Sequence, residues 1–544
     1  EYYKGYADEI RISKGVARYP GGATFSVPTS EYTADKYDVL LLHCNGSDSG
    51  TTFTDSSWVG IGGPPKTITA NGDATNQRPQ PHDVTANGDA HLIGPKVGTS
   101  LIAQDGTGDY LSLSDHADWD FSGQFTIEGW FNWNSFLSSQ TGDLIGSATN
   151  AAYLGASKSG WVMGTQNTSG DLTFSYQSNN SWVFELDFSY IFNENEWYHV
   201  TISRDGSNDI RGFVNGTQVG TTQNNSTSIV TTEGLWVGGG YNSTARILDG
   251  YMGPIRISDT ARYTSDFDIP TSSFTDDSDT VLLIQNGTDG TQTFTDDNSS
   301  GRSAHTITAN GDVRWFAPKV GAGAMAFDGT TDYLKASSHG KELGLTSDAW
   351  TVECWWRTND ITDTYQGIMS GSAPVGTDGD GNWGVIFNYT HVNTSNKVGL
   401  WLGQGASAGW NIANSLGGSV TSFANNTWYH MALTYDGSTY TLWHNGVSQL
   451  TVSSSSQVGG ALTTPSINIG AWGSNGNTFN GYIDGVRVTN GTCRYTGSFD
   501  PPTTAFTDSI NDVLIVDADV NEGTWFQDTS TGLAISTDSR MKFD

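Results

Sequence analysis

The stretch GYMGPIRISDTARY (residues 250–263) decides the organisation of this chain, because it occurs three times. The other copies are GYADEIRISKGVARY at residues 5–19 and GYIDGVRVTNGTCRY at residues 481–495. Each copy is followed by a segment rich in Pro, Thr, Ser and Phe, and then by a hydrophobic strand that begins VLL or VLI. Internal repeats at a fixed, long period indicate tandem copies of one structural unit. The spacing predicts a domain of about 230–240 residues.

The repeats predict two complete domains, at residues 37–268 and 279–500. Residues 1–28 match only the end of a repeat, and residues 512–544 match only the beginning of one. We therefore expect the sequence to be a window cut from a longer array. The alternative is a mature chain whose two ends pair to complete a domain.

Short strands and tight turns predict an all-β fold. Phe125–Phe131 and Tyr198–Ile202 alternate between apolar and polar side chains, as half-buried strands do. Asn-Gly and Asp-Gly dipeptides, such as Asn215-Gly216 and Asn445-Gly446, favour the positive φ angles of two-residue hairpins. No stretch carries a sustained helical apolar stripe. We predict tandem antiparallel β-sandwiches.

The ordered landmarks VLLLHCNG, TFTDSS, ITANGD, DGTGDYL, FTIEGWF, WYHVTISRDG, VNG and GYMGPIRIS resemble the laminin-G-like family of the concanavalin A-like jelly-roll superfamily. The resemblance covers both complete units and both fragments. It implies a jelly-roll sandwich, a fold that hosts lectins, adhesion modules and glucanases, so it says less about function. Tandem copies with this order of motifs are similar to those in structural proteins of marine phages and in large secreted adhesins.

The composition excludes several partners. Asp and Glu number 57 against 25 Lys and Arg, which gives a net charge of −32. Such a surface repels phosphate backbones and anionic lipid, so neither nucleic-acid nor membrane-surface binding is expected. No segment approaches the roughly 18 continuous apolar residues of a membrane span, so no membrane insertion is expected.

The acidic residues do not predict an enzyme. Retaining glycoside hydrolysis needs two carboxyl groups roughly 5 Å apart. Glu185 and Asp187 come nearest to that pattern, but they lack a third acid and have no counterpart in the second unit. Glu128 recurs as Glu353, and each stands alone between apolar neighbours, as a surface or capped strand residue does. We expect the repeated strand histidines, His199 and His430, to be hydrogen-bonded core or face residues, and we assign no catalytic residue.

Calcium is the cofactor for which the sequence offers candidate ligands. Two D-G-x-x-D turns and one D-x-D-x-N segment place carboxylates close together, and Ca²⁺ takes six to eight oxygen ligands. The alternative is that the first two are Asx-type turns which position the strands that follow, and that the third is a Gly-rich hairpin tip. The candidate metal ligands are Asp105, Asp109, Asp328, Asp332, Asp378 and Asp380.

Aromatic residues in polar loops are the candidate ligand-binding residues. Sugars stack their C–H faces on aromatic rings while polar groups bond the hydroxyls. Trp182 and Trp410 lie in polar loops, and Tyr241 and Trp472 lie near Gly-rich turns. The alternative is that these four rings are structural.

These observations favour a non-enzymatic exterior protein at a virion or at a cell surface. It would be a virion fibre or appendage, or an adhesin, that attaches to glycans and contacts neighbouring copies or virion proteins. Two alternatives stay open: the carbohydrate-targeting array of a secreted glycoside hydrolase, and a purely architectural shell or decoration protein.

Overall fold

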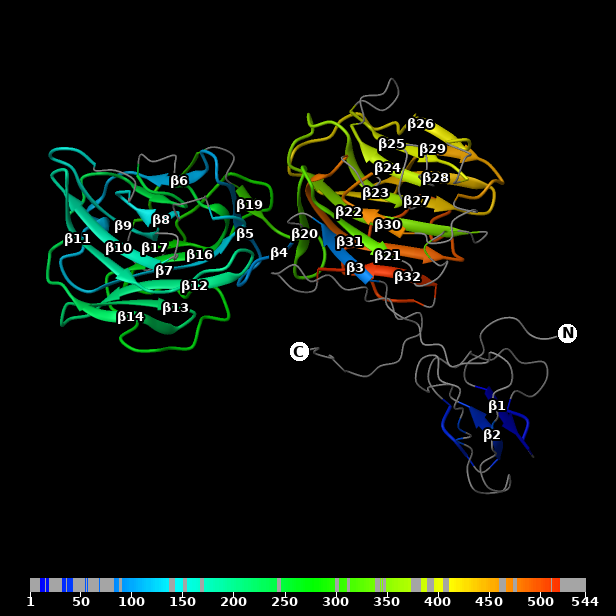
Figure 1. Cartoon of the computed structure of the whole chain (residues 1–544), viewed down its shortest axis with the longest axis horizontal. Coiled ribbons are helices and arrows are strands. Elements are labelled where there is room, and N and C mark those ends of the chain that lie inside the picture. The colour runs from blue at the N-terminus through cyan, green and yellow to red at the C-terminus, as the bar shows by residue number, and fades with distance from the viewer. Residues whose placement is uncertain are drawn as a thin grey trace.

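The structure is a computed structural model of the whole chain (Figure 1). It describes residues 10–14, 16–18, 32–35, 37–42, 54, 56, 68, 83–87, 91–136, 142–149, 154–166, 171–241, 246–298, 303–310, 314–337, 343, 345, 349–372, 383–388, 396–404, 410–458, 466–472, 477–509 and 511–518. Two β-sandwiches lie side by side, and each consists of a seven-stranded and an eight-stranded sheet. Among the described residues no helix is long and apolar enough to cross a bilayer. The predicted all-β fold of tandem antiparallel sandwiches is confirmed.

The first sandwich is built mainly from residues 101–258. Its seven-stranded sheet has the order β11 (Ser181–Phe188), β10 (Asp171–Ser178), β9 (Ser159–Gln166), β8 (Asp143–Gly146), β15 (Leu235–Val237), β6 (Tyr110–Leu113), β18 (Thr308–Asn310). Its eight-stranded sheet has the order β14 (Thr217–Asn224), β13 (Asp209–Val214), β12 (Trp197–Arg204), β7 (Phe125–Trp133), β16 (Asp249–Ser258), β5 (Leu101–Asp105), β19 (Arg314–Phe316), with β17 (Thr280–Ile284) also on β16. The 3₁₀ helix η1 (Ala117–Trp119) follows β6.

The second sandwich repeats this arrangement. Its eight-stranded sheet has the order β29 (Val447–Ser453), β28 (Thr439–His444), β27 (Tyr429–Tyr435), β22 (Trp350–Thr358), β31 (Asn480–Asn490), β20 (Ala324–Asp328), β4 (His91–Ile93), with β32 (Asp512–Val516) also on β31. Its seven-stranded sheet has the order β26 (Ala413–Gly417), β25 (Val398–Leu402), β24 (Trp383–Phe387), β23 (Gln366–Ser372), β30 (Ser466–Ile469), β21 (Tyr333–Ser337), β3 (Asp83–Asn87). Near the N-terminus, β1 (Ile10–Ser13) pairs with β2 (Asp38–Leu42).

Alternation of side chains builds each core. On β7, Phe125, Ile127, Phe131 and Trp133 point between the two sheets and are fully or almost fully buried. On β22 the counterparts of the first three, Trp350, Val352 and Trp356, belong to an equivalent core in the second sandwich. The hairpin prediction also holds, because Asn215 has a φ of 49° and Gly216 a φ of 76° between β13 and β14. Such a pair of positive φ angles is what a two-residue type I′ turn requires.

The two sandwiches exchange hairpin strands. β3 and β4 precede the first sandwich in sequence, yet they pair with β21 and β20 of the second (Figure 1). β18 and β19 precede the second sandwich, yet they pair with β6 and β5 of the first. Each sheet of one unit therefore ends in a strand supplied from just before the other unit.

A third apolar cluster joins the two units where the strands cross. It contains Trp130, Trp197 and Tyr251 of the first unit together with Tyr482 of the second. The bonding is reciprocal: Trp197 Nε1 donates to the Gly94 carbonyl oxygen, and Trp428 Nε1 donates to the Ala317 carbonyl oxygen, both at 3.1 Å. These two carbonyls belong to the residues that directly follow β4 and β19. The exchanged strands are thus fixed by buried contacts as well as by sheet pairing.

The hydrophobic strand after each repeat motif completes the preceding unit. β17 pairs with β16, and β32 pairs with β31 in the same register. The sequence analysis placed the strand that starts at Val281 at the beginning of the domain predicted for residues 279–500. The sheet of the first unit instead extends past residue 268, because the side chains of Val281, Leu282 and Ile284 are buried in the first core.

The Pro/Thr/Ser/Phe segment between β16 and β17 covers a sheet face. Phe267 stacks on Tyr263 with ring centroids 3.6 Å apart, and Phe274 is 5% exposed. Both phenylalanine rings contact His199, which lies on the outer face of β12. We call residues 259–279 the strap. The strap closes the outer face of the eight-stranded sheet with its apolar side chains.

We predict that Phe316→Ala destabilises the chain by about 3–5 kcal/mol, because the ring is fully buried and lies 4.4 Å from the Tyr482 ring. Chemical denaturation followed by tryptophan fluorescence measures this loss. Ile191→Ala is the control, since that side chain is 75% exposed and its removal should cost no more than about 0.5 kcal/mol. Equal effects of the two substitutions would contradict the buried crossing of β19.

Candidate functional site

Three tryptophans gather on the outer face of the seven-stranded sheet in the second unit. Trp472 follows β30, and its ring centroid lies 4.8 Å from that of Trp401 on β25 and 5.2 Å from that of Trp410. Both contacts are edge-to-face, with interplanar angles of 85° and 67°. Trp401 is 4% exposed, whereas Trp410 and Trp472 are partly exposed. The structure thus brings together two of the four predicted aromatic residues.

Glycine makes room for this cluster. A Cβ atom at Gly384 on β24 would lie 3.2 Å from the six-membered ring of Trp472. Gly384 pairs with Trp401 across the strands, so it lies under both rings. A larger residue at position 384 would therefore push Trp472 away from the sheet.

The first unit carries a different aromatic group on the equivalent face. Tyr110 on β6 stacks on Trp236 on β15 at 3.6 Å, and Trp236 lies 5.7 Å from Tyr241. Lys158 Nζ lies 5.7 Å from the Tyr241 ring centroid and 3.2 Å from a carboxylate oxygen of Glu233. Hydrogen bonding to Glu233, with burial second, raises the pKa of Tyr241 to about 12. The phenol therefore stays protonated at neutral pH and remains a hydrogen-bond donor.

Trp182 lies on the edge strand β11, in register with Gln177 of β10, and is partly exposed.

Sequence reasoning did not select Tyr110, Trp236 or Trp401. Each of these lies inside a strand, where alternation alone does not say which face is covered. The alternation could have placed these three rings on the outer face, because apolar neighbours such as Leu111, Leu235 and Leu400 point into the core.

The two D-G-x-x-D segments form identical turns. The Asp109 carboxylate accepts a hydrogen bond from the Asp105 backbone N–H at 3.1 Å, and Asp332 accepts from Asp328 at 2.9 Å. Asp105 and Asp328 in turn accept from the backbone N–H of the residue two positions on. These bonds are those of the Asx-turn alternative. Calcium at these residues stays a prediction, and Asp378 and Asp380 lie outside the described residues.

Glu128 lies in a buried polar network rather than alone as the sequence analysis expected. Its carboxylate accepts hydrogen bonds from Arg256 at 2.6 and 2.8 Å and from the Tyr263 hydroxyl at 3.0 Å. His199 Nε2 lies 3.1 Å from the same carboxylate. Sequence alternation places Glu128 on the outer face but cannot show that the strap covers it.

Glu353 repeats this network with Arg487, Tyr495 and His430. Burial alone would raise the pKa of Glu353, but His430, Arg487 and Tyr495 outweigh it and hold the pKa below its usual value. His199 and His430 are fully buried, so the expectation of hydrogen-bonded core histidines holds for His199. Both carboxylates are unexposed, and Glu128 cannot reach a substrate without opening of the strap.

Four further acidic side chains of the first unit lie in separate surroundings. Glu185 and Asp187 are exposed alternate residues on β11. Glu194 accepts a hydrogen bond from the Phe136 backbone N–H, and Glu196 accepts one from the Tyr198 hydroxyl. These contacts assign structural partners to Glu194 and Glu196. The prediction that the chain is not an enzyme stays a prediction.

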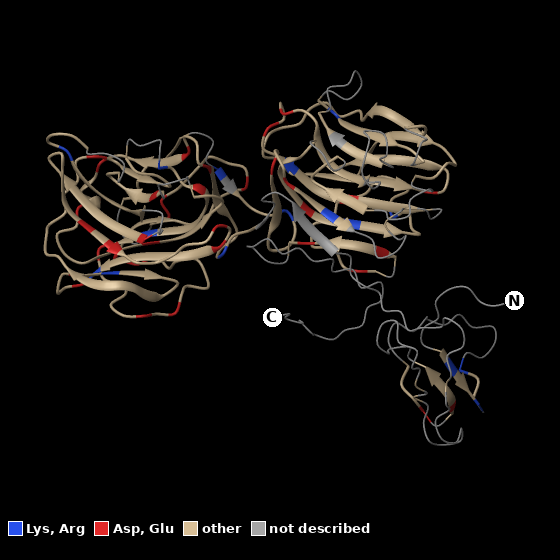
Figure 2. Ribbon diagram, viewed as in Figure 1, with Lys and Arg blue, Asp and Glu red and all other residues tan. Residues whose placement is uncertain are grey.

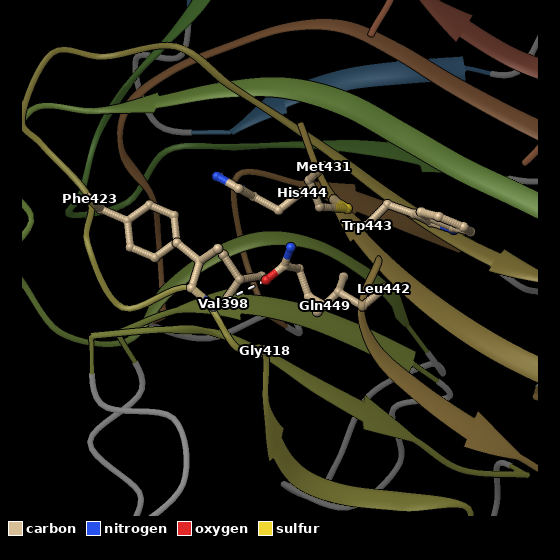
Figure 3. A pocket seen from close by; sticks show the side chains of 9 residues that line it. Val398, Gly418, Phe423, Met431, Leu442, Trp443, His444 and Gln449 are labelled. Atoms are coloured by element: carbon tan, nitrogen blue, oxygen red, sulfur yellow. Dashed lines mark hydrogen bonds between the residues drawn. The ribbon is translucent and has the colours of Figure 1, made fainter. Parts of the chain in front are cut away.

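A small cavity lies between the sheets of the second unit (Figure 3). Val398, Phe423, Met431, His444 and Gln449 contribute to its lining. It holds about one water molecule, which is far smaller than a sugar ring. Burial, with nearby His430 second, lowers the pKa of His444 to about 4, so this histidine is neutral at physiological pH. The cavity is therefore a packing feature and not a ligand pocket.

Asp484 is a buried acid with an unusual pKa. Its Oδ2 accepts hydrogen bonds from the backbone N–H groups of Lys319 and Val320, both at 2.8 Å. Burial raises the pKa of Asp484 to about 8; the backbone donors oppose this shift, and the charge of Asp517 adds to it. The first unit has Gly253 at the equivalent position of β16. This titrating group therefore distinguishes the two units.

Comparison with known proteins identifies the family. The profile of Laminin_G_3, the concanavalin A-like lectin/glucanases superfamily, matches residues 105–266 and 328–494. The chain belongs to this family. The two ranges cover more than half of the sequence, with one range in each sandwich. The predicted resemblance to laminin-G-like tandem domains is thus confirmed, while the resemblance to phage structural proteins and adhesins stays a prediction.

Several solved structures are similar to this member of the laminin-G-like family. Domains LG4-5 of the mouse laminin α1 chain are 13% identical, with 80% of this chain and 98% of that chain covered and a TM-score of 0.24. Domain 4 of AbnA, a GH43 extracellular arabinanase from Geobacillus stearothermophilus solved with arabinotriose, is 18% identical, with 36% and 79% covered and a TM-score of 0.25. A candidate carbohydrate binding protein from Bacteroides ovatus is 14% identical, with 47% and 66% covered and a TM-score of 0.29. No curated protein sequence matches significantly. At these identities the likeness concerns the fold alone.

We predict that Arg256→Met destabilises the chain by about 3–5 kcal/mol, because it leaves the Glu128 carboxylate buried without its strongest partner. Burial opposes ionisation, but the partners hold the Glu128 pKa below 4.5, so their stabilisation is present above that pH and lost as the pH falls below it. Denaturant titrations at several pH values should show the cost of the substitution shrinking in acid. The double variant Glu128→Gln with Arg256→Met is the control and should recover stability. A cost that does not depend on pH would contradict an ionised Glu128.

We predict that Asp484→Asn flattens the pH dependence of stability between about pH 4 and pH 8. The folded chain keeps the Asp484 proton up to about pH 8, whereas an ordinary aspartate loses it near 3.8, so stability falls as the pH rises through this window. Thermal unfolding at pH 5 and pH 8 measures the effect, and the variant should melt higher at pH 8. Asp484→Ala is the comparison, since it also loses the acceptor for two backbone donors. An unchanged slope in both variants would show that Asp484 titrates normally.

Proposed function

We propose that this chain is a non-enzymatic exterior attachment protein whose two sandwiches bind glycans on the outer faces of their seven-stranded sheets. The observation that carries the proposal is the group of Trp401, Trp410 and Trp472. Three large rings on a sheet face, two of them partly exposed, offer apolar area of the kind on which sugar C–H faces stack.

Polar groups stand beside these rings. Gln404 and Asn411 are exposed, and Asn411 Nδ2 donates to Gln404 Oε1 at 2.7 Å. Amide side chains carry both donors and acceptors, so each pairs with a sugar hydroxyl in either direction. Asn411 directly follows Trp410, which puts an amide next to a stacking surface. A ring flanked by amides suits a hydroxyl-bearing, uncharged ligand.

The charge distribution favours uncharged glycans over polyanionic ones. The net charge of −32 repels sulfated or strongly acidic sugars. Most of the described ribbon is drawn in the colour of uncharged residues (Figure 2). In the first unit Lys158 beside Tyr241 adds one cation, which Glu233 neutralises. The second unit is therefore proposed as the main platform for uncharged glycans.

The exterior location is part of the same proposal. Tandem sandwiches of the laminin-G-like family, joined by exchanged strands, suit a virion fibre or appendage, or a surface adhesin, in which binding sites must be held apart on a rigid support. Neighbouring copies or virion proteins would be its protein partners. The proposal needs no cofactor.

We predict that Trp410→Ala and Trp472→Ala each reduce glycan binding at least tenfold, because each removes a stacking surface worth about 1.4 kcal/mol or more. A glycan array identifies the ligand, and calorimetry with that oligosaccharide measures the loss. Trp182→Ala tests the other predicted platform and should have no effect on a ligand of the second unit. Unfolding curves confirm that each variant folds. A glycan-array profile that neither substitution changes would contradict binding at these tryptophans, and an array on which the parent chain binds no glycan would favour the purely architectural alternative.

A further inference from the structure

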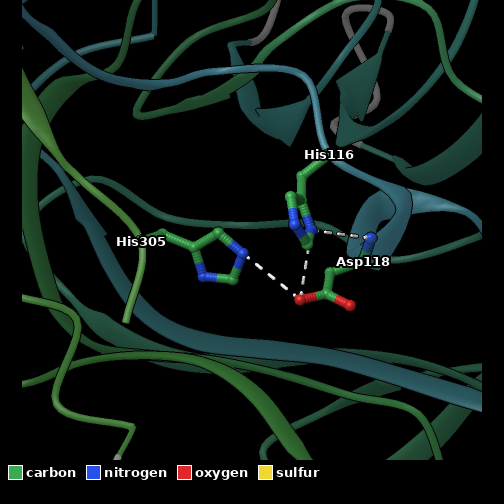
Figure 4. Close-up of side chains that lie close together, drawn as sticks. All are labelled: His116, Asp118 and His305. Carbon is green, nitrogen blue, oxygen red and sulfur yellow. Dashed lines mark hydrogen bonds and ion pairs between the residues drawn. The ribbon is translucent and has the colours of Figure 1, made fainter. Parts of the chain in front are cut away.

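Two histidines and an aspartate meet at the edge of the first sandwich (Figure 4). His116 and Asp118 flank the start of η1, and His305 comes from the segment that leads into the exchanged strand β18. Asp118 Oδ2 lies 3.2 Å from His116 Nδ1 and 3.3 Å from His305 Nε2. The three ligand atoms lie within 4.8 Å of one another. Sequence reasoning missed this group, because 187 residues separate Asp118 from His305.

The hydrogen bonds of His305 fix which ring nitrogen carries the lone pair. Its Nδ1 lies 2.8 Å from Asp296 Oδ2, and the same oxygen accepts the His305 backbone N–H at 2.9 Å. The other Asp296 oxygen accepts the backbone N–H groups of Leu283 and Asn298. Asp296 is therefore an acceptor only, so Nδ1 carries a proton and donates it. In the neutral ring Nε2 then has a lone pair, which points toward Asp118.

This arrangement leaves Nε2 without a hydrogen bond. The His305 side chain is only 9% exposed, and its Nε2 makes no hydrogen bond within the described part of the chain. A lone pair that faces a carboxylate is repelled unless a proton or a metal cation lies between them. A histidine that donates its other nitrogen to a carboxylate is the usual setting of a metal ligand.

Two of the three distances between the ligand atoms match those around a tetrahedral ion. With ligand bonds of about 2.0–2.1 Å, neighbouring ligands of a tetrahedral Zn²⁺ stand about 3.3 Å apart. The two distances from Asp118 to the histidines are 3.2 and 3.3 Å. Metal binding through His116 Nδ1 would replace the 3.2 Å hydrogen bond that this atom accepts from the Asp118 backbone N–H. His116 is half-exposed, so its ring can adjust and a water molecule can reach the fourth position.

We propose that His116, Asp118 and His305 bind one divalent transition-metal ion of the zinc class, with Asp296 orienting His305. Two imidazoles and a carboxylate are ligands that Zn²⁺ accepts, whereas Ca²⁺ takes six to eight oxygens. The ion joins η1 of the first unit to residues 303–310, which enter the exchanged strand β18. The ion would thus fix residues 303–310 on the first sandwich.

The repeat predicts one such ion per chain. In sequence, His339 and His82 occupy the positions equivalent to His116 and His305. Lys341 stands where the first unit has Asp118. A lysine brings a positive charge in place of a ligand, so a second ion is not expected there.

The test is calorimetric titration of the EDTA-treated, dialysed full chain with ZnCl₂ at pH 7.5. We expect one ion per chain, a higher melting temperature with zinc, and visible absorption bands of tetrahedral geometry when Co²⁺ replaces zinc. Asp118→Asn and His305→Gln should each weaken binding at least tenfold, and Asp296→Asn should weaken it about tenfold to a hundredfold. His116→Ala, at an exposed position, keeps the test valid if a buried variant fails to fold.

Asp115→Asn is the matched control, because it changes a nearby exposed carboxylate outside the group and should bind zinc as the parent does. Excess Ca²⁺ should not compete. The proposal is overturned if zinc gives no heat beyond dilution, or if the ligand variants bind zinc as tightly as the control.

Discussion

A carboxylate buried on the outer face of each eight-stranded sheet constrains the rest of the structure. Glu128 on β7 is satisfied by Arg256 from β16, His199 from β12 and Tyr263 from the strap. A buried charge that loses one partner costs several kcal/mol, so all four segments must arrive together. The motif that recurs along the chain supplies the arginine and the tyrosine of this network. It also supplies the second arginine, Arg262, which binds Asp277 at the far end of the strap. The arginines and the final tyrosine that recur in the repeated motif therefore serve the ion network rather than ligand binding.

Closure by the strap decides which surfaces remain available. With the strap in place, the outer face of the eight-stranded sheet has become interior. Beyond the end of the strap, Trp130 and Trp197 are covered by the other unit through the shared cluster. The exchanged strands extend this cover, because β4 and β19 lie at the crossing and pair with β20 and β5. The outer faces of the seven-stranded sheets are not covered by the strap. The aromatic groups occur there.

Sequence alone gave the fold class, the repeat and the hairpin turns, since alternation and Asn-Gly pairs act locally. It could not give the strand exchange. The segments that form β3 and β18 carry the same residues Thr-Ala-Asn, so each fits the edge of either unit, and tertiary packing alone chooses the partner. It also could not show that Glu128 and His199 face a strap rather than solvent, because the alternation is the same in both cases. Of the aromatic residues chosen from loops, Trp410 and Trp472 meet, but their third member, Trp401, was hidden inside a strand. The group of His116, Asp118 and His305 left no local pattern at all.

The two units agree in their framework and differ where a ligand would bind. The ion network and the Trp–carbonyl bonds at the crossing are present in both. On the seven-stranded sheet, by contrast, the position that pairs with Gly384 carries Trp401, whereas the position that pairs with Val162 carries Ser175. A valine in place of glycine removes the space that Trp472 fills, and the first unit has Tyr241 with a lysine and a glutamate instead. The differences between the two units at these paired positions therefore depend on one another, because the large ring of Trp472 needs the glycine beneath it. The second unit thus carries three tryptophans on this face, whereas the first carries Tyr110, Trp236 and Tyr241 beside a lysine and a glutamate. This asymmetry supports the proposal that the two faces bind different ligands.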